Sequence, residues 1–424
     1  MLDIKFIREH VKEVKDNIKK KSQDDKVKLV DDVLKKDGQH LKLLQQEQEI
    51  RTKRNRVHAE INALKKQGKD IKQVLKDAKK LPGELKKVEE KRIALANEIG
   101  EILLTIPNMM HKSVPKGKDD TENVVREKIG KPKKFSFDVK SHGELAEELD
   151  IVDFDASAAV AGNGFYYLKG DLVLLNQALQ QYGLNFMIQK GYIPVEPPLM
   201  INKRATQGVV DFETFRDMIY KIEEEDLYLI ATSEHPLISM FVDKILEENQ
   251  LPIKFVGISP CFRKEVGSHG LDERGLYRTH QFNKIEMIVI CKPEESYDYY
   301  DELLGLSKEL FKSLGLPSRV YESCSGDLGD LKAKGADLEA WSPRKKDYFE
   351  VCSCSNLTEA QSRRLNIRVR KGGEKYYPHT LNNTAIATSR AMVAILENFQ
   401  NKDGSVDIPK VLQPFMGKKK IEKR

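Results

Sequence analysis

The sequence predicts an α+β protein: an N-terminal antiparallel α-helical coiled-coil arm, followed by a domain built on a largely antiparallel β-sheet flanked by helices. Two observations predict this fold class. An apolar repeat with a period of seven residues is confined to the first 110 residues, and short β-rich segments alternate with longer helical patterns after it. A chain of 424 residues is also long for a single core and fits two or three domains.

The arm is predicted from two apolar runs that flank Gly68. The first run repeats every seven residues at Leu43, Ile50, Val57 and Leu64. The second run holds two interleaved series, which are Ile71, Ala78, Leu85, Arg92 and Ile99 and then Val74, Leu81, Val88, Leu95 and Ile102. Two such stripes predict a helical hairpin over residues 1–110 with its tip near Gly68. Because Pro82 lies inside the second run, we expect a kink or break there.

The charge of the chain is concentrated in this arm. The whole protein has a net charge of +6, whereas residues 1–110 hold 27 Lys and Arg against 19 Asp and Glu. Within the arm, residues 51–80 hold 11 against 3. A solvated helix face is one interpretation, but a localised cluster of one sign favours a polyanion such as nucleic acid. The cations concerned are Arg51, Lys53, Arg54, Arg56, Lys65, Lys66 and Lys69.

Beyond the arm, residues 111–135 are predicted to be a polar linker, 136–416 the second domain and 417–424 a disordered basic tail. An amphipathic helix is predicted over 171–190, with Gly191 placed to end it. Further helices are expected at 235–248, 294–314 and 385–400. The β-rich segments are LYLIAT, KFVGISP and IEMIVIC.

Composition excludes several classes of protein. No run approaches the roughly 18 apolar residues of a membrane span, and the N-terminus is charged from its third residue, so we expect a cytoplasmic protein without a membrane partner. Five scattered cysteines are typical of reduced thiols. Cys352 and Cys354 leave a structural zinc site open as a minor alternative. Neither GxxxxGK[ST] nor GxGxxG occurs, so a bound nucleotide would have to be held by side chains.

The segment LYRTHQFNKIE, 276–286, carries an unusual polar pattern. In a strand, Arg278, His280, Phe282, Lys284 and Glu286 would all point to one face. An edge strand with a solvated face is the simple interpretation. However, CFRKEVGSHGLDERG, 261–275, would form a second strand with Arg263 and Glu265 on the same face, followed by a loop that leads back. This surface suits ATP, because guanidinium groups bind phosphate and an aromatic ring stacks on adenine.

These residues resemble a known family. FRKE together with RTHQFNKIE resembles motif 2 of the class II aminoacyl-tRNA synthetases, in the form found in seryl-tRNA synthetases. KGYIPVEPP, 190–198, is similar to motif 1, which forms the dimer interface in that family, and NNTAIATSR, 382–390, is similar to motif 3. The basic hairpin resembles the arm with which seryl-tRNA synthetases hold tRNA. The resemblance extends over nearly the whole chain.

The resemblance implies roles for individual residues. TSE, 232–234, matches the family's T-x-E loop, and EVCSCSN, 350–356, is similar to a segment that binds the Mg²⁺ of ATP. Serine binding is implied for Thr232, Glu234, Arg263, Glu286, Asn382 and Thr384. ATP binding is implied for Arg263, Glu265, Arg278, Thr279, Phe282, Glu350, Ser353 and Arg390, with Glu350 and Ser353 as Mg²⁺ ligands. NNT, 382–384, is expected to be a loop and departs from the family's N-G-S or N-G-T, so the effect of Asn383 on the serine pocket is left open.

The implied activity is that of an ATP-dependent serine–tRNA ligase. Serine would be activated to seryl-adenylate and transferred to the 3' end of serine tRNA, and selenocysteine tRNA is left open as a second acceptor. Arg263 would be the catalytic residue that bridges the α-phosphate and the serine carboxylate. The resemblance also implies a homodimer in which the arm of one subunit serves the active site of the other. His280 is expected to be structural, and Lys284 could support either Glu286 or a phosphate.

Two alternatives remain at this point. One is an enzyme of the same fold that loads a small amino acid onto a carrier protein, which should lack a basic hairpin. The other is a catalytically inactive relative that binds RNA, which should have lost Arg263, Glu350 or Arg390.

Overall fold

The computed structural model describes residues 1–211, 215–265 and 275–423. The chain divides into two compact units, Met1–Pro107 and Asn108–Arg424. The loop expected within 261–275 lies largely outside the described residues. Among the helices of the described ranges, none has both the length and the apolar character needed to cross a membrane.

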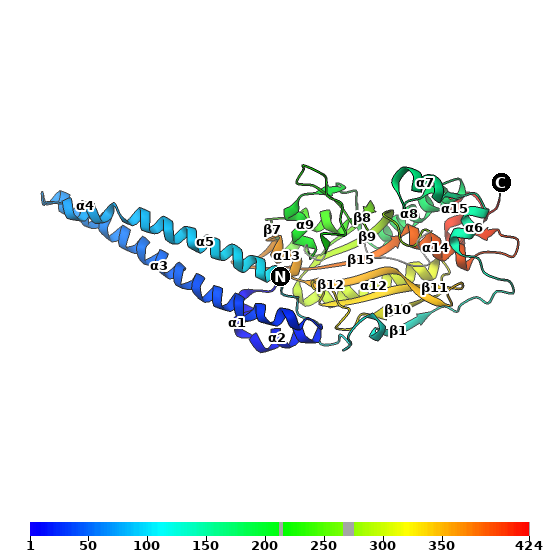
Figure 1. Cartoon of the computed structure of the whole chain (residues 1–424), viewed down its shortest axis with the longest axis horizontal. Helices are drawn as coiled ribbons and strands as arrows, with labels where there is room; N and C mark the ends of the chain where they lie inside the picture. Colours follow the sequence, from blue (N-terminus) through cyan, green and yellow to red (C-terminus); the bar gives the residue numbers. More distant parts are fainter. Residues whose placement is uncertain (212–214, 266–274, 424) are drawn as a thin grey trace. The chain divides into compact units, whose positions relative to one another are not determined.

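The first unit is a helical hairpin, as predicted (Figure 1). Gly68 ends the first long helix with φ +67°, a conformation that glycine adopts without strain. The second helix is broken at residues 79–80, and Pro82 lies in the first turn of its last segment, where a proline is tolerated. The helices are α1 (Ile4–Glu9), α2 (Val11–Lys20), α3 (Val27–Lys66), α4 (Lys72–Ala78) and α5 (Leu81–Thr105).

The seam between α3 and α5 combines apolar and charged layers. Val57, Ile61 and Leu81 form a buried cluster near the tip. Farther along, Arg92 of the predicted apolar series instead donates from Nε to Oε2 of Glu47 at 2.6 Å. Glu47 is only 7% exposed, and this hydrogen bond, with a second from Arg51, holds its pKa below the usual range although its desolvation opposes ionisation. A buried polar layer of this kind specifies the register of a coiled coil.

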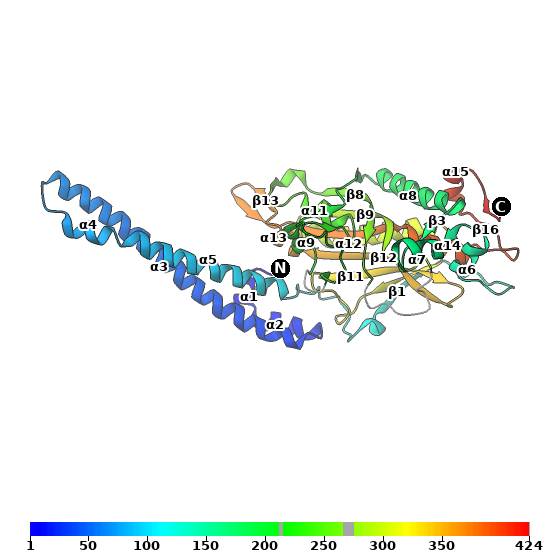
Figure 2. The same cartoon turned by 45° about the horizontal axis from the view of Figure 1, so that its top comes forward.

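The second unit contains an eight-stranded sheet in the order β1-β10-β11-β12-β15-β9-β8-β4 (Figure 2). All neighbouring pairs are antiparallel except β4 and β8, so the predicted α+β class is confirmed. The strands are β1 (Val124–Ile129), β4 (Ile193–Val195), β8 (Ile253–Phe262), β9 (Gln281–Cys291), β10 (Ser318–Glu322), β11 (Lys334–Ser342), β12 (Asp347–Thr358) and β15 (His379–Ala387). The remaining strands are β2 (Val152–Asp153), β3 (Tyr167–Leu168), β5 (Met200–Ile201), β6 (Tyr228–Leu229), β7 (Ile245–Glu247), β13 (Arg368–Lys371), β14 (Glu374–Tyr376), β16 (Val406–Asp407) and β17 (Lys420–Ile421).

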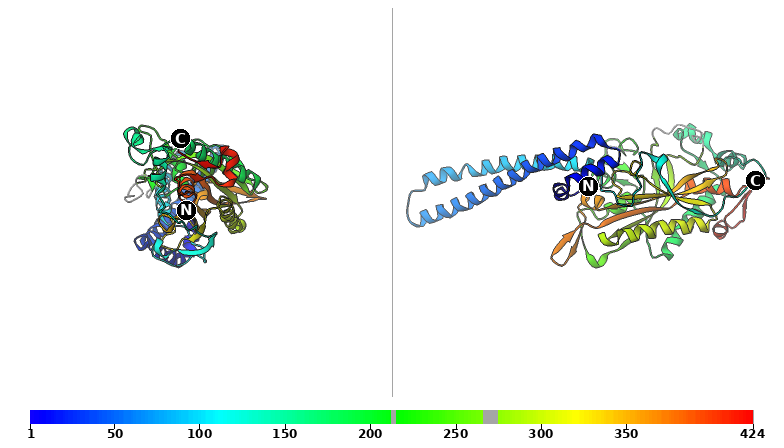
Figure 3. Two further views of the ribbon diagram at one scale, coloured as in Figure 1. Left: turned by 90° about the vertical axis from the view of Figure 1, so that its right-hand side faces the viewer. Right: turned by 90° about the horizontal axis from the view of Figure 1, so that it is seen from below.

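Helices cover both faces of this sheet. The larger core lies between one face and the helices α8 (Asp171–Gln189), α12 (Ser296–Ser313) and α14 (Thr388–Asn398), and α12 runs along the strands in Figure 3. A smaller core lies between the other face and α9 (Lys203–Val209), α11 (Glu234–Ser239) and α13 (Ala360–Arg364). The helices α6 (His142–Glu148), α7 (Phe154–Ala161) and α15 (Gln413–Met416) complete the unit. Gly191, with φ +85°, follows α8 as predicted.

Three sequence predictions are corrected by this fold. Within the segment expected to be a linker, residues 124–129 form the edge strand β1 of the main sheet. The helix expected over 235–248 ends at Ser239, and Ile245–Glu247 pairs in parallel with β13 as strand β7. The basic tail is ordered at Lys420–Ile421, because Ile421 is fully buried against the core and β17 pairs with β16.

Candidate active site

The candidate site lies along one face of β9, beside the smaller core. Side chains alternate along the strand, so Phe282, Lys284, Glu286, Ile288 and Ile290 share a face. Ile288 and Ile290 belong to the smaller core beneath α9, α11 and α13. The other three line two cavities instead, which explains the polar pattern that the sequence presented.

The larger cavity has a volume of about 280 Å³. It gathers five of the six residues expected to bind serine, namely Thr232, Glu234, Arg263, Glu286 and Asn382. The sixth, Thr384, lies opposite Glu286 in the pairing of β15 with β9 but lines the smaller cavity. Segments far apart in the chain therefore meet at one site.

Four carboxylates and three cations line the larger cavity, namely Asp211, Glu234, Glu286 and Asp330, and Arg263, Lys284 and Lys332. Lys284 Nζ lies 2.7 Å from Glu286 Oε2 and 3.4 Å from the Thr232 hydroxyl, so in this structure Lys284 supports Glu286. Glu234 accepts a hydrogen bond of 2.7 Å from Gln361 Nε2. Burial, and next the nearby charge of Glu286, raise the pKa of Glu234 to about 7. An ammonium group bound beside Glu234 and Glu286 would favour the ionised form of Glu234.

The smaller cavity, of about 120 Å³, adjoins the larger one, since Arg263, Lys284 and Ser353 line both. Of the residues expected to bind ATP, it gathers Arg263, Glu265, Thr279, Phe282, Glu350, Ser353 and Arg390. The Arg263 guanidinium carbon lies 5.3 Å from the centre of the Phe282 ring, and Arg263 Nε donates to the Ala231 carbonyl at 3.3 Å. Arg263 is therefore held in place at the junction of the two cavities.

A second arginine that lines the smaller cavity is also held in place. Arg390 Nη1 lies 3.0 Å from Glu350 Oε2 and donates to the Glu350 carbonyl at 3.1 Å. Its guanidinium also lies over the Tyr277 ring, 5.0 Å from the ring centre. Burial is the largest single influence and favours the neutral form of Glu350, but the charge and hydrogen bond of Arg390 and the charges of Arg263 and Lys332 together lower the pKa of this carboxyl group. Glu350 is thus ionised.

A β-bulge brings the two candidate Mg²⁺ ligands to one face of β12. Glu350 and Ser353 are three residues apart, so a regular strand would point them to opposite faces. The register shifts by one residue at Val351, because Cys352 pairs with Leu338 and Glu350 with Glu339. Such a bulge adds one residue and restores the common face. An ionised carboxylate and a hydroxyl at one cavity are the hard oxygen ligands that suit Mg²⁺, so the donor set fits this ion.

Some predicted site residues lie outside both cavities. Arg278 precedes strand β9, has a half-exposed side chain and lies 3.8 Å from Glu265. His280 also precedes the strand, and its ring stacks on Phe165 and contacts the Tyr220 hydroxyl. The expected alternation therefore fails before residue 281. His280 has a packing environment, in line with the structural role expected for it.

The loop expected at NNT, 382–384, is instead part of a strand. Asn383 lies within strand β15 rather than in a loop, and its side chain points away from the cavities. Its Nδ2 donates to the Leu303 carbonyl and to the Ser307 hydroxyl of α12, both at 2.8 Å. Because neighbouring residues of a strand face opposite sides, Asn382 reaches the larger cavity while Asn383 joins the core.

The structure also adds residues that the sequence did not indicate. Tyr277 and Ser389 line the smaller cavity, and Lys332 lines the larger one. Lys332 Nζ lies 3.4 Å from the Ser353 hydroxyl. Lys332 follows β10 in a segment with no recognisable motif, so no signal could have found it. Tyr277 lies within the quoted segment, directly beside Arg278, and could have been singled out as an aromatic residue.

The arm carries the predicted basic residues on α3 and just beyond its end. Lys53, Arg56, Lys65, Lys66 and Lys69 are exposed. Arg51 differs from them, since it pairs with Glu47 at 2.9 Å and with Glu89 at 2.6 Å. Part of the predicted cationic surface therefore stabilises the hairpin itself.

Comparison with protein families agrees with this description. Residues 218–399 match the family model of the tRNA synthetase class II core domain (G, H, P, S and T). Fold and site thus define a class II aminoacyl-tRNA synthetase core. Residues 1–110 match the model of the seryl-tRNA synthetase N-terminal domain. The chain belongs to the seryl-tRNA synthetase, or serine–tRNA ligase, family.

Individual relatives are similar over most of the chain. The serine–tRNA ligase of Methanocorpusculum labreanum is 51% identical over 338 residues, which cover 79% of this chain and 80% of the relative. The crystal structure of seryl-tRNA synthetase from Pyrococcus horikoshii complexed with ATP is 41% identical, with a TM-score of 0.94 and complete coverage of both chains. The cytoplasmic serine–tRNA ligase from Naegleria fowleri in complex with AMP is 34% identical, with a TM-score of 0.89 over 100% of this chain and 99% of that one.

Proposed function

We propose that this protein is an ATP-dependent serine–tRNA ligase, which converts L-serine and ATP to seryl-adenylate and then charges serine tRNA. The observation that carries the proposal is the pair of adjoining cavities with Arg263 at their junction. One cavity has carboxylates suited to an amino acid, and the other has arginines and an aromatic ring suited to a nucleotide. Membership of the family supports the same conclusion.

The larger cavity is the proposed serine site. Glu234 and Glu286 bind the ammonium group and the hydroxyl group, together with Thr232 and Asn382, and Thr384 borders the site from the adjoining cavity. Alanine lacks the hydroxyl group of serine and would leave a buried hydrogen-bond acceptor of the site unpaired. Sites that hydrogen-bond a substrate hydroxyl discriminate strongly against analogues that lack it, so serine is preferred. Threonine would be distinguished less sharply, since one methyl group is worth only about 1–3 kcal/mol.

The smaller cavity is the proposed ATP site. Phe282 stacks on adenine, Glu265 and the main chain of Thr279 approach its edge, and Arg390 binds the outer phosphates. Arg278, which lies outside the cavity, would have to turn inward from its half-exposed position to join Arg390. Glu350 and Ser353 would hold Mg²⁺, which would neutralise phosphate charge there.

The first chemical step needs no nucleophile from the protein. A serine carboxylate oxygen attacks the α-phosphorus, the bond to the bridging oxygen of pyrophosphate breaks, and pyrophosphate leaves with the electron pair. Arg263 contacts both the carboxylate and the α-phosphate, so it aligns two anions and neutralises the charge that accumulates between them. In the second step a terminal ribose hydroxyl of tRNA attacks the seryl carbonyl carbon, whose bond to the phosphate oxygen of AMP breaks. AMP leaves with the electron pair, and the hydroxyl proton passes to its phosphate.

The arm supplies tRNA recognition in this proposal. Phosphates of tRNA contact the cations between residues 51 and 69, whose clustering and exposure favour a polyanion. The protein is a homodimer in the cytoplasm, formed through the segment 190–198, and the arm of one subunit serves the active site of the other.

The test is ATP–pyrophosphate exchange with purified protein and Mg²⁺, offering each amino acid in turn, followed by aminoacylation of serine and selenocysteine tRNA transcripts. We expect exchange with serine alone. Exchange driven by glycine or alanine would favour loading of a carrier protein, and no exchange with any amino acid would indicate the inactive RNA-binding relative.

A further inference from the structure

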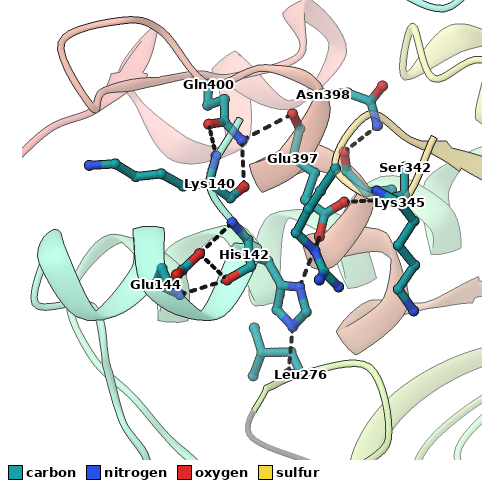
Figure 4. A network of polar contacts seen from close by, with 12 residues as sticks. Lys140, His142, Glu144, Leu276, Ser342, Lys345, Glu397, Asn398 and Gln400 are labelled. Carbon is teal, nitrogen blue, oxygen red and sulfur yellow. Dashed lines mark hydrogen bonds and ion pairs between the residues drawn. The ribbon is translucent and has the colours of Figure 1, made fainter. Parts of the chain in front are cut away.

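His142 joins three segments that are distant in the sequence (Figure 4). It is the first residue of α6, whose start is fixed by a capping box between Ser141 and Glu144. Its Nδ1 lies 3.1 Å from Oε1 of Glu397 in α14, and its Nε2 lies 3.1 Å from the backbone nitrogen of Leu276. The side chains of His142 and Glu397 are almost fully buried, with exposures of 4% and 1%.

The hydrogen-bond partners of His142 determine which ring nitrogen carries the proton. A backbone N–H can only donate, so Nε2 must accept from Leu276 and Nδ1 must carry the proton that is donated to Glu397. Burial opposes ionisation of Glu397, but hydrogen bonds from His142 and Ser342 hold the pKa of this carboxyl group below its usual range. Arg344 Nε also faces it at 3.5 Å. The carboxylate is therefore a permanent acceptor that orients the ring toward Leu276.

A glycine allows the close approach of the two segments. A Cβ atom at position 275 would lie 2.4 Å from His142 Nε2, which is closer than nonbonded atoms can come. Any side chain at Gly275 would push the ring or the backbone aside and break the contact with Leu276.

Leu276 leads directly into the nucleotide cavity. The next residue, Tyr277, lines that cavity, lies beneath the Arg390 guanidinium, and packs edge-on against Phe349 with ring centres 5.5 Å apart. Thr279 and Phe282 follow within the same stretch and line the cavity as well. The backbone at Leu276 is therefore the point at which this wall of the cavity begins.

We infer that His142 is a positioning residue for ATP: its Nε2 anchors the Leu276 backbone and so holds Tyr277 and the wall that follows in the geometry that binds the nucleotide. The inference rests on the proposed function, because it assigns the smaller cavity to ATP. His142 touches neither cavity and acts only through the segment that it anchors.

Two substitutions separate the two hydrogen bonds of the ring. His142→Asn places an amide near the position of Nδ1, so it keeps a donor for Glu397 and loses the acceptor for Leu276. His142→Gln places an oxygen near the position of Nε2, so it keeps the acceptor. Loss of one hydrogen bond in the anchor should weaken ATP binding by about 5-fold in His142→Asn, and by about 2-fold or less in His142→Gln.

The measurement is the Kd of ATP with Mg²⁺ by titration calorimetry on the full chain, together with the KM of ATP and of serine in exchange. Gly275→Ala should resemble His142→Asn, and Ser342→Ala, which removes the other hydrogen bond to Glu397, should leave the Kd within about 2-fold of wild type. The KM of serine should not follow the KM of ATP.

The outcomes are distinct. The inference is supported if ATP binding is weaker in His142→Asn and Gly275→Ala while it stays within about 2-fold of wild type in His142→Gln and Ser342→Ala. Equal effects of His142→Asn and His142→Gln, or a Kd unchanged in both, overturn it. A wild-type protein that binds ATP but shows no serine-dependent exchange contradicts the proposed function and leaves the comparison of Kd values valid.

Discussion

The basic residues of the arm and those of the two cavities differ in number, exposure and partners. Most of the predicted cations of the arm are exposed, and they are repeated along one stretch of helix. In the cavities Arg263, Lys284 and Arg390 each have a defined contact with a carbonyl, a carboxylate or an aromatic ring. Charges in water are screened and act collectively, whereas charges in a cavity act individually and strongly. Removal of one cavity residue should therefore have a larger effect than removal of several arm residues.

The largest effect is expected for Arg263→Ala. This change removes the cation at the junction of the two cavities, and loss of one preorganised group of this kind lowers the rate by about 10² to 10³. The measurement is serine-dependent ATP–pyrophosphate exchange at saturating substrates. Lys264→Ala is the matched control, because Lys264 is adjacent in sequence but lines neither cavity. A similar loss of rate in both variants would contradict the role of Arg263.

The next effect concerns Glu234 and the pH dependence of stability. Its pKa is raised to about 7 in the folded protein, so the folded state binds more protons than the unfolded state between roughly pH 4.5 and 7. The contribution of this carboxyl group to stability therefore falls as the pH rises through that window, by about 3 kcal/mol in total. Glu234→Gln should be more stable than wild type at pH 8 and similar to it at pH 4.5.

Urea unfolding at the two pH values measures this difference. Trp341 is the only tryptophan and lies in β11, so its fluorescence reports on the second unit alone. Glu223→Gln, at an exposed position, is the control for the loss of one carboxylate. If the stabilising effect of Glu234→Gln were the same at pH 4.5 and pH 8, the pKa of Glu234 would not be raised in the folded protein.

A third prediction concerns the arm. Replacement of Lys65, Lys66 and Lys69 by alanine should weaken tRNA binding and reduce the slope of log K against log salt by about 2 to 3, because each phosphate contact contributes about one unit or less. Serine-dependent exchange without tRNA should be unchanged. Filter binding at several salt concentrations provides the slope. The control is a triple alanine variant at three other exposed lysines of the same unit, Lys12, Lys28 and Lys35. An equal loss of tRNA binding in the control would show that the basic cluster does not bind tRNA specifically.

The same contrast describes what could be predicted from the sequence. The arm was predictable because its packing follows one period, and because Gly68 and Pro82 marked the turn and the break in the second helix. The pairing of β8 with β9 was predictable for the same reason, since a period of two placed Phe282, Lys284 and Glu286 on one face. A regular period reveals the structure because the residues that repeat with it lie on one face of the helix or strand.

The features that were missed are local departures from a period. The bulge at Val351 changes the face of β12 on which Glu350 lies. Glu265 has φ +46°, so its side chain does not follow the alternation of a regular strand either. The tail at Lys420–Ile421 is ordered by contact with β16 rather than by its own composition. These arrangements depend on partners distant in the chain, and a single sequence contains no signal for them.

The smallest effect on catalysis is expected for Asn383→Ala. Asn382 and Asn383 are the same residue type on opposite faces of β15, so a comparison of the two tests which face forms the serine site. Asn383→Ala removes the hydrogen bonds to Leu303 and Ser307 in α12, so stability should fall by about 2 kcal/mol, about 1 kcal/mol for each bond, while the KM of serine stays within about 2-fold. Asn382→Ala, one residue earlier on the opposite face of the strand, should raise the KM of serine instead. Exchange kinetics and urea unfolding of both variants distinguish the two faces. If Asn383→Ala raised the KM of serine more than Asn382→Ala did, the register of β15 against β9 would be wrong, and with it the alignment that places Glu286 in the cavity.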